Sequence, residues 1–180
     1  CWGYNGLGHL GNGSTENVGD EPGEMGDNLP LVELFENPVS SKSLSVGYNH
    51  TCAVLAVSPT SIKCWGHNGF GQLGVGQYSD TLGDEPGEMG DNLPWFLDGP
   101  YGSSTAIDNV HAGQYHTCAR FQDGSAMCWG EGGSGQLGIG GINGVGGSGP
   151  PTEYVSLGTG KTVANTSTSR NESGIQAGHR

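Results

Sequence analysis

Short apolar runs separated by glycine-rich and polar turns dominate the chain, and their spacing predicts β-strands rather than helices. Residues 51–57 and 61–65 form one pair of β-prone runs around a Ser-Pro turn, and residues 118–121 and 125–129 form a second pair around Asp-Gly. Further runs flank these pairs, at 31–35, 44–46, 95–97, 107–110 and 154–157. No stretch carries a helical period long enough to compete, so we expect about four short strands in each unit.

The chain repeats itself at a period of about 64 residues. A Cys-Trp-Gly block at 1–13 returns at 64–76 and at 128–140, with offsets of 63 (64 − 1) and 64 (128 − 64). A block containing His-Thr-Cys-Ala, at 47–53, returns at 113–119. A third block, GDEPGEMGDNLP at 19–30, returns letter for letter at 83–94. Self-similarity of this kind is typical of repeat architectures.

These blocks resemble the repeat of the regulator of chromosome condensation, in its patterns Trp-Gly-x-Asn-x-x-Gly-Gln-Leu-Gly-x-Gly and Ala-Gly-x-x-His-Thr-Cys-Ala. The resemblance covers nearly the whole chain. It implies an all-β fold, a partial β-propeller built of four-stranded antiparallel blades, about three of roughly seven. We expect a partial repeat at 1–40, repeats at 41–106 and 107–169, and the start of a further repeat at 170–180.

The two ends of the sequence also bear on its extent. The chain begins at Cys1 rather than Met, and residues 176–178 match 111–113, just before a His-Thr-Cys block. We therefore expect a piece of a longer protein, whose remaining propeller blades would be its first partners.

Composition and charge narrow the functional classes. Glycine makes up 36 of 180 residues and apolar residues only 33%, which suits an all-β fold with many tight turns better than packed helices. The formal net charge of −12 repels phosphate backbones, so direct nucleic-acid binding is not expected. No apolar run approaches the roughly 18 residues of a membrane span.

The cysteines suggest a compartment. Cys52 and Cys64 stand at the two ends of one expected hairpin, and Cys118 and Cys128 at the ends of another. An odd-numbered turn, such as residues 122–124 with a left-handed glycine, would place each pair directly opposite. Cys1 matches Cys64 and Cys128, so its partner would lie upstream. One disulfide per blade indicates an oxidising compartment; the alternative is reduced cysteine filling small buried slots. A zinc site needs four converging ligands and is a poorer interpretation.

Glycosylation sequons also favour secretion. Four are present, and residues 165–173, a polar stretch that contains two of them, are the best candidate for modification. Asn49 borders a strand expected to be buried, where a glycan would fit poorly. The candidate acceptors are Asn12, Asn49, Asn165 and Asn171.

The repeated acidic loop is a candidate contact surface. Clustered carboxylates are the ligands that Ca²⁺ prefers, but the spacing matches no calcium loop, and residues 145–151 of the third unit contain none. We therefore expect solvated acids on a loop that Met25 and Leu29 anchor, with no metal and no cofactor. The loop-contact candidates are Asp20, Glu21, Glu24, Asp27, Asp84, Glu85, Glu88 and Asp91, together with the aromatic residues Trp95 and Phe96.

Histidine and tryptophan recur at equivalent positions, which favours packing over catalysis. His50 and His116 each precede Thr-Cys, and we interpret them as sites of a recurring structural hydrogen bond. Trp2, Trp65 and Trp129 are expected to pack between blades. No nucleophile elbow, phosphate-binding loop or isolated catalytic constellation occurs, so no catalytic residue is assigned.

The functional hypothesis is a non-catalytic scaffold that binds a protein or a glycan, in a secreted or cell-surface protein. The first alternative, which the family resemblance implies, is a cytoplasmic or nuclear guanine-nucleotide exchange factor for a Ran-like GTPase. The second is a structural unit of an extracellular assembly, suggested by the loops repeated letter for letter.

Overall fold

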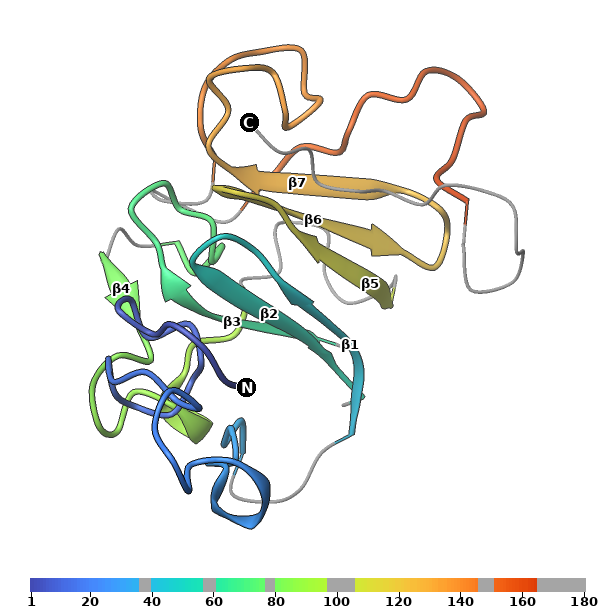
Figure 1. Ribbon diagram of the computed structural model, residues 1–180. Coiled ribbons are helices and arrows are strands. Elements are labelled where there is room, and N and C mark those ends of the chain that lie inside the picture. Colours follow the sequence, from blue (N-terminus) through green and yellow to red (C-terminus); the bar gives the residue numbers. More distant parts are fainter. Residues whose placement is uncertain (36–39, 57–60, 77–79, 97–105, 146–150, 165–180) are drawn as a thin grey trace.

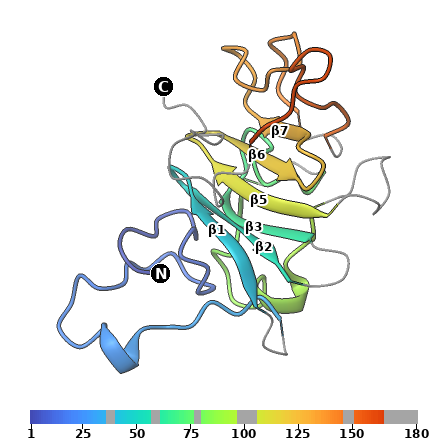
Figure 2. The ribbon, with the colours of Figure 1, turned by 90° about the vertical axis from the view of Figure 1, so that its right-hand side faces the viewer.

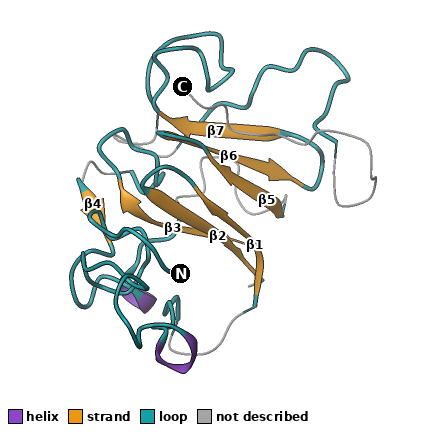
Figure 3. Cartoon of the chain, in the orientation of Figure 1, coloured by secondary structure: helices purple, strands orange, loops and turns teal. Residues whose placement is uncertain are grey.

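The structure is a computed structural model that describes residues 1–35, 40–56, 61–76, 80–96, 106–145 and 151–164. Strands and loops make up almost all of this part, as Figure 3 shows. The two helical elements there are single 3₁₀ turns, η1 (Gly26–Asn28) and η2 (Gly90–Asn92). None of the helices in the described residues is long and apolar enough to cross a membrane.

The first complete blade is an antiparallel sheet with the strand order β1-β2-β3-β4. Its strands are β1 (Ser41–Val46), β2 (His50–Leu55), β3 (Ser61–His67) and the short β4 (Thr81–Leu82). Every residue of β2 is buried, because β1 and β3 flank this strand within the sheet and further segments cover both of its faces. An apolar sequence such as Ala53–Leu55 suits a strand buried on both faces.

The second blade repeats this arrangement with β5 (Ile107–Ala112), β6 (His116–Phe121) and β7 (Ala126–Gly130). The β6–β7 connection is the expected three-residue turn: the Phe121 nitrogen donates to the Ser125 oxygen (3.0 Å) and Gly124 has a φ of +82°. Residues other than glycine rarely adopt this conformation. The two sheets lie within the expected repeats 41–106 and 107–169.

The outer edge of each blade differs from the expectation. The runs at 31–35, 95–97 and 154–157 are not strands in their described parts; Trp95 and Tyr154 form single bridges, to Lys63 and Met127. Nearer the other end of β3, Leu82 pairs with Gly66. The fourth position of the blade is therefore shared by two short segments, which residues 83–94 separate.

The same interruption occurs in every unit. Bridges equivalent to that between Gly66 and Leu82 join Gly3 to Val18 and Gly130 to Val145. The acidic loop at 19–30 follows the bridge to Val18, and the loop at 83–94 follows the pairing of Leu82. Both loops therefore project from the outer edge of a blade. A broken edge strand that carries charged residues disfavours edge-to-edge pairing with other sheets.

The two blades lie side by side, with β5 next to β1 and β2 (Figures 1 and 2). One hydrophobic core runs through both blades and contains Val54, Leu55, Val110 and the fully buried Trp65 and Trp129. Because an aromatic side chain buries roughly 150–250 Å², the two indoles are the largest single contributors to this packing.

Candidate functional site

A repeated hydrogen-bond junction joins successive units. The Thr51 hydroxyl and the Trp65 indole N–H both donate to the His9 carbonyl oxygen, at 2.8 and 3.1 Å. One unit later, Thr117 and Trp129 donate in the same way to the Gln72 oxygen, at 2.7 and 2.9 Å. These contacts account for the threonines and tryptophans that recur in the sequence.

Glycine makes this junction possible. A Cβ atom built on Gly11 would lie 2.5 Å from the Trp65 indole nitrogen, and one on Gly74 would lie 2.7 Å from that of Trp129. Both glycines have φ near +70°, at +74° and +69°. Each glycine therefore provides both the turn and the space in which the next blade seats its tryptophan.

The predicted structural role of His50 agrees with its surroundings. The ring is fully buried, and its Nε2 atom lies 2.9 Å from the Thr117 hydroxyl of the next blade. Burial lowers the pKa of His50 to about 3, and the neighbouring His116, His67 and His9 act in the same direction. His50 is therefore neutral at pH 7, and its Nδ1 atom has no hydrogen-bond partner among the described residues.

The acidic loops are more ordered than the expectation of solvated carboxylates. A single Glu88 oxygen accepts the backbone N–H groups of Gly83, Asp84 and Glu85, at 2.9, 3.2 and 3.1 Å. Glu24 accepts those of Gly19 and Glu21 in the first copy, at 2.8 and 3.0 Å. These two glutamates are thus structural, and the expectation is wrong for them because the turns direct several N–H groups toward one point. The other acids of the loops are Asp20, Glu21, Asp27, Asp84, Glu85 and Asp91.

The two copies of the loop pack differently. Met25 is 44% exposed, whereas Met89 is partly buried against the core and Leu93 is fully buried. The second copy lies on the glycines of the first unit: a Cβ atom on Gly8 would come within 2.7 Å of the Asp84 backbone. Identical sequences therefore have different environments. In the described residues, no group of three or more His, Cys, Asp or Glu side chains is arranged to hold a metal ion.

The cysteines of each blade stand opposite one another. Cys52 pairs with Cys64 in the β2–β3 register, and Cys118 with Cys128 in the β6–β7 register, each with a Cα–Cα distance of 4.1 Å. Both pairs of Sγ atoms lie at disulfide distance. Cys1 is half-buried and has no disulfide partner in the described part of the chain.

A buried lysine that the sequence analysis did not single out links two units. Lys63 is fully buried in β3, and its Nζ atom donates to the Leu34 and Gly90 oxygens, at 3.0 and 2.6 Å. The same atom lies 4.3 Å from the centre of the Phe35 ring and 4.8 Å from that of Trp95. Burial lowers the pKa of Lys63, and the nearby Asp91 acts in the opposite direction.

The remaining aromatic candidates separate into buried and exposed residues. Phe96 is 4% exposed and packs on Trp129, with 4.4 Å between ring centres, while Trp95 is 37% exposed. Trp2 was expected to pack between blades but is 65% exposed. The reason is that no described segment covers Trp2 in the way that Gly11 covers Trp65.

The candidate glycosylation sites lie in different environments. Asn12 is half-buried, and its side-chain oxygen accepts a hydrogen bond from the Asn5 amide (3.0 Å). Asn49 is also half-buried, and its backbone oxygen accepts the His67 N–H (2.8 Å). Asn165 and Asn171, like the expected repeat start at 170–180, lie outside the described residues.

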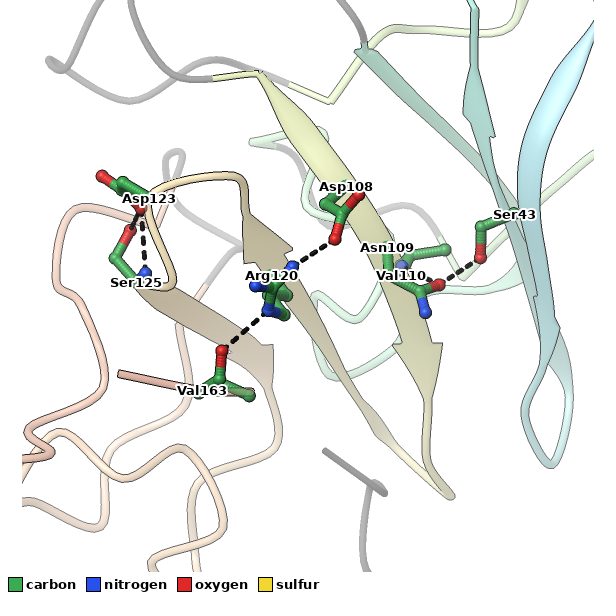
Figure 4. A network of polar contacts seen from close by, with 8 residues as sticks. All are labelled: Ser43, Asp108, Asn109, Val110, Arg120, Asp123, Ser125 and Val163. Atoms are coloured by element: carbon green, nitrogen blue, oxygen red, sulfur yellow. Dashed lines mark hydrogen bonds and ion pairs between the residues drawn. The ribbon is translucent and has the colours of Figure 1, made fainter. Parts of the chain in front are cut away.

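A polar network runs across the blades at the end opposite the His50 junction (Figure 4). Ser43 of the first blade bonds Asn109 of the second, and Arg120 pairs with Asp108 within the second blade. Arg120 also donates to the Val163 oxygen (2.9 Å). In the nearby turn, hydrogen bonds from Ser125 lower the pKa of Asp123.

Four rings form a partly exposed cluster over the junction of the two blades, here called the aromatic ridge: Tyr48, His67, Phe70 and Tyr115. The Tyr115 ring centre lies 4.9 Å from that of Phe70, 6.0 Å from that of Tyr48 and 6.4 Å from that of His67. Tyr48 is 60% and Phe70 42% exposed. Sequence reasoning missed this cluster, because its members stand at non-equivalent positions of successive units.

Leu44 of β1 is an exposed apolar residue. It is 56% exposed, whereas its equivalent, Val110, is 1% exposed because it packs in the core shared with β2. The face of β1 that carries Leu44 is therefore of the type that packs against another blade.

Comparison with known proteins agrees with this architecture. Residues 1–54 and 107–136 each match a family model described as the regulator of chromosome condensation (RCC1) repeat. The serine/threonine-protein kinase Nek9 of Xenopus laevis is 36% identical over 96 residues, which make up 53% of this chain and 9% of that protein.

Solved structures show the same fold. Human WBSCR16 matches 91% of this chain and 40% of its own, with a TM-score of 0.61 and 18% identity. Prp20p of Saccharomyces cerevisiae matches 93% of this chain and 34% of its own, with a TM-score of 0.53 and 20% identity. The chain thus covers well under half of each of these relatives.

The repeated blades and their junctions define a β-propeller repeat protein. Residues 1–54 and 107–136 identify RCC1 repeats in this chain.

Proposed function

We propose that this chain is part of a non-catalytic propeller scaffold that binds a protein partner, in a secreted or cell-surface protein. The observation that carries the proposal is that the repeated side chains capable of polar chemistry have structural roles. His50, Thr51, Thr117 and the two buried tryptophans all contribute to contacts between units. The rings of the aromatic ridge also meet across the two blades, but Tyr48 and Phe70 remain exposed. Exposed aromatic clusters are typical of protein interfaces.

A photo-crosslinking experiment tests this proposal on the full-length protein. A photoreactive amino acid replaces Phe70, or, as the control, the exposed Gln122 at the other end of the second blade. We expect an adduct from position 70 that excess unlabelled protein competes away, and none from position 122. Equal labelling from both positions, or no competed adduct, would contradict a specific binding role.

Localisation outside the cytosol is supported by the cysteine pairs, since disulfides persist in oxidising compartments. Non-reducing peptide mapping of the protein from its native source should find Cys52 linked to Cys64 and Cys118 linked to Cys128. Free thiols at all four positions would count against secretion and favour a cytoplasmic or nuclear protein.

Guanine-nucleotide exchange on a Ran-like GTPase is the second candidate function. Its support is the fold shared with Prp20p, whose crystal structure is described together with its binding properties to Gsp1p and histones. A likeness at 20% identity extends to the fold, and function depends on sites that differ within a fold. Nucleotide release from a Ran-like GTPase, measured with the full-length protein, distinguishes the two candidates.

A further inference from the structure

The aromatic ridge lies on an acidic end of the molecule. It sits where β1 turns into β2, where β5 turns into β6 and where β3 ends, so both blades contribute to one surface. The turns are tied to the strand ends, because the His67 nitrogen donates to the Asn49 oxygen (2.8 Å) and the Glu131 nitrogen to the Tyr115 oxygen (2.9 Å). The backbone that carries His67 and Tyr115 is thus held in place before any partner binds.

Carboxylates flank these rings. Glu131 follows β7 directly, and its Oε2 atom accepts a hydrogen bond from Gln136 (3.2 Å). Asp80 is exposed; its backbone oxygen accepts the Asn68 N–H (2.9 Å), and its charge acts on the His67 ring. Burial nevertheless lowers the pKa of His67, so this ring joins the ridge without a positive charge at pH 7.

The lysines and arginines of the described residues lie elsewhere. Lys42 is near the start of β1, and Arg120 is near the end of β6. Lys161 is close to the turn at 122–124, since the Val163 nitrogen donates to the Gly124 oxygen (2.8 Å), and Lys63 is buried. The ridge end of the described structure therefore carries aromatic faces and carboxylates without a lysine or arginine.

We propose that the aromatic ridge binds an arginine-rich segment of a protein partner. The proposal rests on the proposed binding function and specifies the chemistry of the partner. A guanidinium group stacks on aromatic faces and is attracted to a ring within about 6 Å of its centre. The carboxylates of Glu131 and Asp80 supply complementary charge beside the rings. Lysine is more strongly hydrated than arginine and stacks less well, so arginine is the better match.

The test uses the full-length protein and a fluorescein-labelled peptide of alternating arginine and glycine, about ten residues long, in a fluorescence-anisotropy titration. The double variant F70L/Y115L keeps apolar side chains but removes two rings, and we expect its affinity to fall by about tenfold. E131Q removes one charge beside the ridge, and we expect a loss of about threefold to fivefold. E85Q is the matched control, because it removes the same charge from the exposed second acidic loop, and its affinity should stay within about twofold of the wild type.

The other outcomes overturn the proposal. An equal loss in E85Q and E131Q would mean that net charge alone attracts the peptide. A lysine peptide that binds equally well, or peptide binding that F70L/Y115L leaves unchanged, would exclude recognition by the rings. Binding of a neutral chito-oligosaccharide in place of the peptide would identify the ridge as a glycan site.

Failure of this inference is distinguishable from failure of the binding function. If no peptide binds but the competed crosslink from position 70 is present, the scaffold function stands and the arginine-rich partner is wrong. Near-ultraviolet circular dichroism of each variant checks that its fold is retained; the substituted side chains are at least partly exposed.

Discussion

Replacing Thr117 by valine tests the hydrogen bonds that join the two blades. The Thr117 hydroxyl, fully buried, donates to the Gln72 oxygen at 2.7 Å and lies 2.9 Å from the His50 Nε2 atom. Valine keeps the branched shape and removes both contacts. The Gln72 oxygen retains the Trp129 indole as a donor, but the His50 ring then has two buried nitrogen atoms without a partner among the described residues.

The expected magnitude follows from these contacts. Loss of an ordinary hydrogen bond costs about 0.5–1.5 kcal/mol, and a buried polar group left without a partner costs about 1–3 kcal/mol. Thr117→Val should therefore lower the free energy of unfolding by about 2–4 kcal/mol. Thr51→Val is the matched control, because its hydroxyl makes the equivalent donation to the His9 oxygen, which the Trp65 indole also reaches. Its cost should be about 1 kcal/mol, since no histidine bond is lost.

Urea unfolding near pH 7.5 provides the measurement, with tryptophan fluorescence as the signal because Trp65 and Trp129 lie at the two junctions. The informative quantity is the difference between the two variants, which should be about 1–3 kcal/mol. Equal destabilisation by Thr117→Val and Thr51→Val would refute the argument that the bond to His50 stabilises the blade junction.

Three further predictions concern the polar contacts of His50, Lys63 and Glu88. Lowering the pH from about 7.5 to 5.5 should cost about 1.4 kcal/mol of stability through His50, because its folded pKa near 3 lies below its unfolded value near 6.5 and only the unfolded chain gains the proton. Urea unfolding at both pH values should show a smaller pH dependence for His50→Gln, and an unchanged dependence would contradict this assignment. Lys63→Met should speed hydrogen exchange at the Gly90 amide by at least about tenfold. This amide donates to the Glu33 oxygen, and Lys63 holds both segments through its bonds to the Leu34 and Gly90 oxygens. Unchanged protection would show that the lysine is dispensable. Glu88→Ala should speed exchange at the amides of residues 83–85, which lose their acceptor, while the first acidic loop, with its own glutamate, stays unchanged. Equal changes in both loops would indicate a global effect.

Local signals in the sequence predicted much of the blade. Cysteines separated by an even number of residues across a three-residue turn predicted the facing positions of Cys118 and Cys128, and a glycine at 124 predicted the left-handed turn. The recurrence of His-Thr-Cys predicted a structural role for His50. These predictions succeed because strand alternation and turn geometry depend on residues close together in the chain.

Other features depend on segments far apart in the sequence. Lys63 looks like an exposed strand residue until Leu34 and Gly90 are brought to its Nζ atom. The acidic loops have one sequence and two environments, because only the second copy packs on Gly8. No pattern within either segment distinguishes these outcomes.

The sequence alone determined the repeat, the strands at the centre of each blade, the facing cysteines and the acidic character of the molecule. The tertiary structure decided which carbonyl each threonine and tryptophan reaches, which lysine is buried and which rings meet to form the aromatic ridge. The physical reason is that a repeat specifies each blade through local geometry, whereas the hydrogen bonds of the threonine, tryptophan and histidine junctions join residues 42–67 positions apart. Their partners are defined only when the chain folds and the blades pack together.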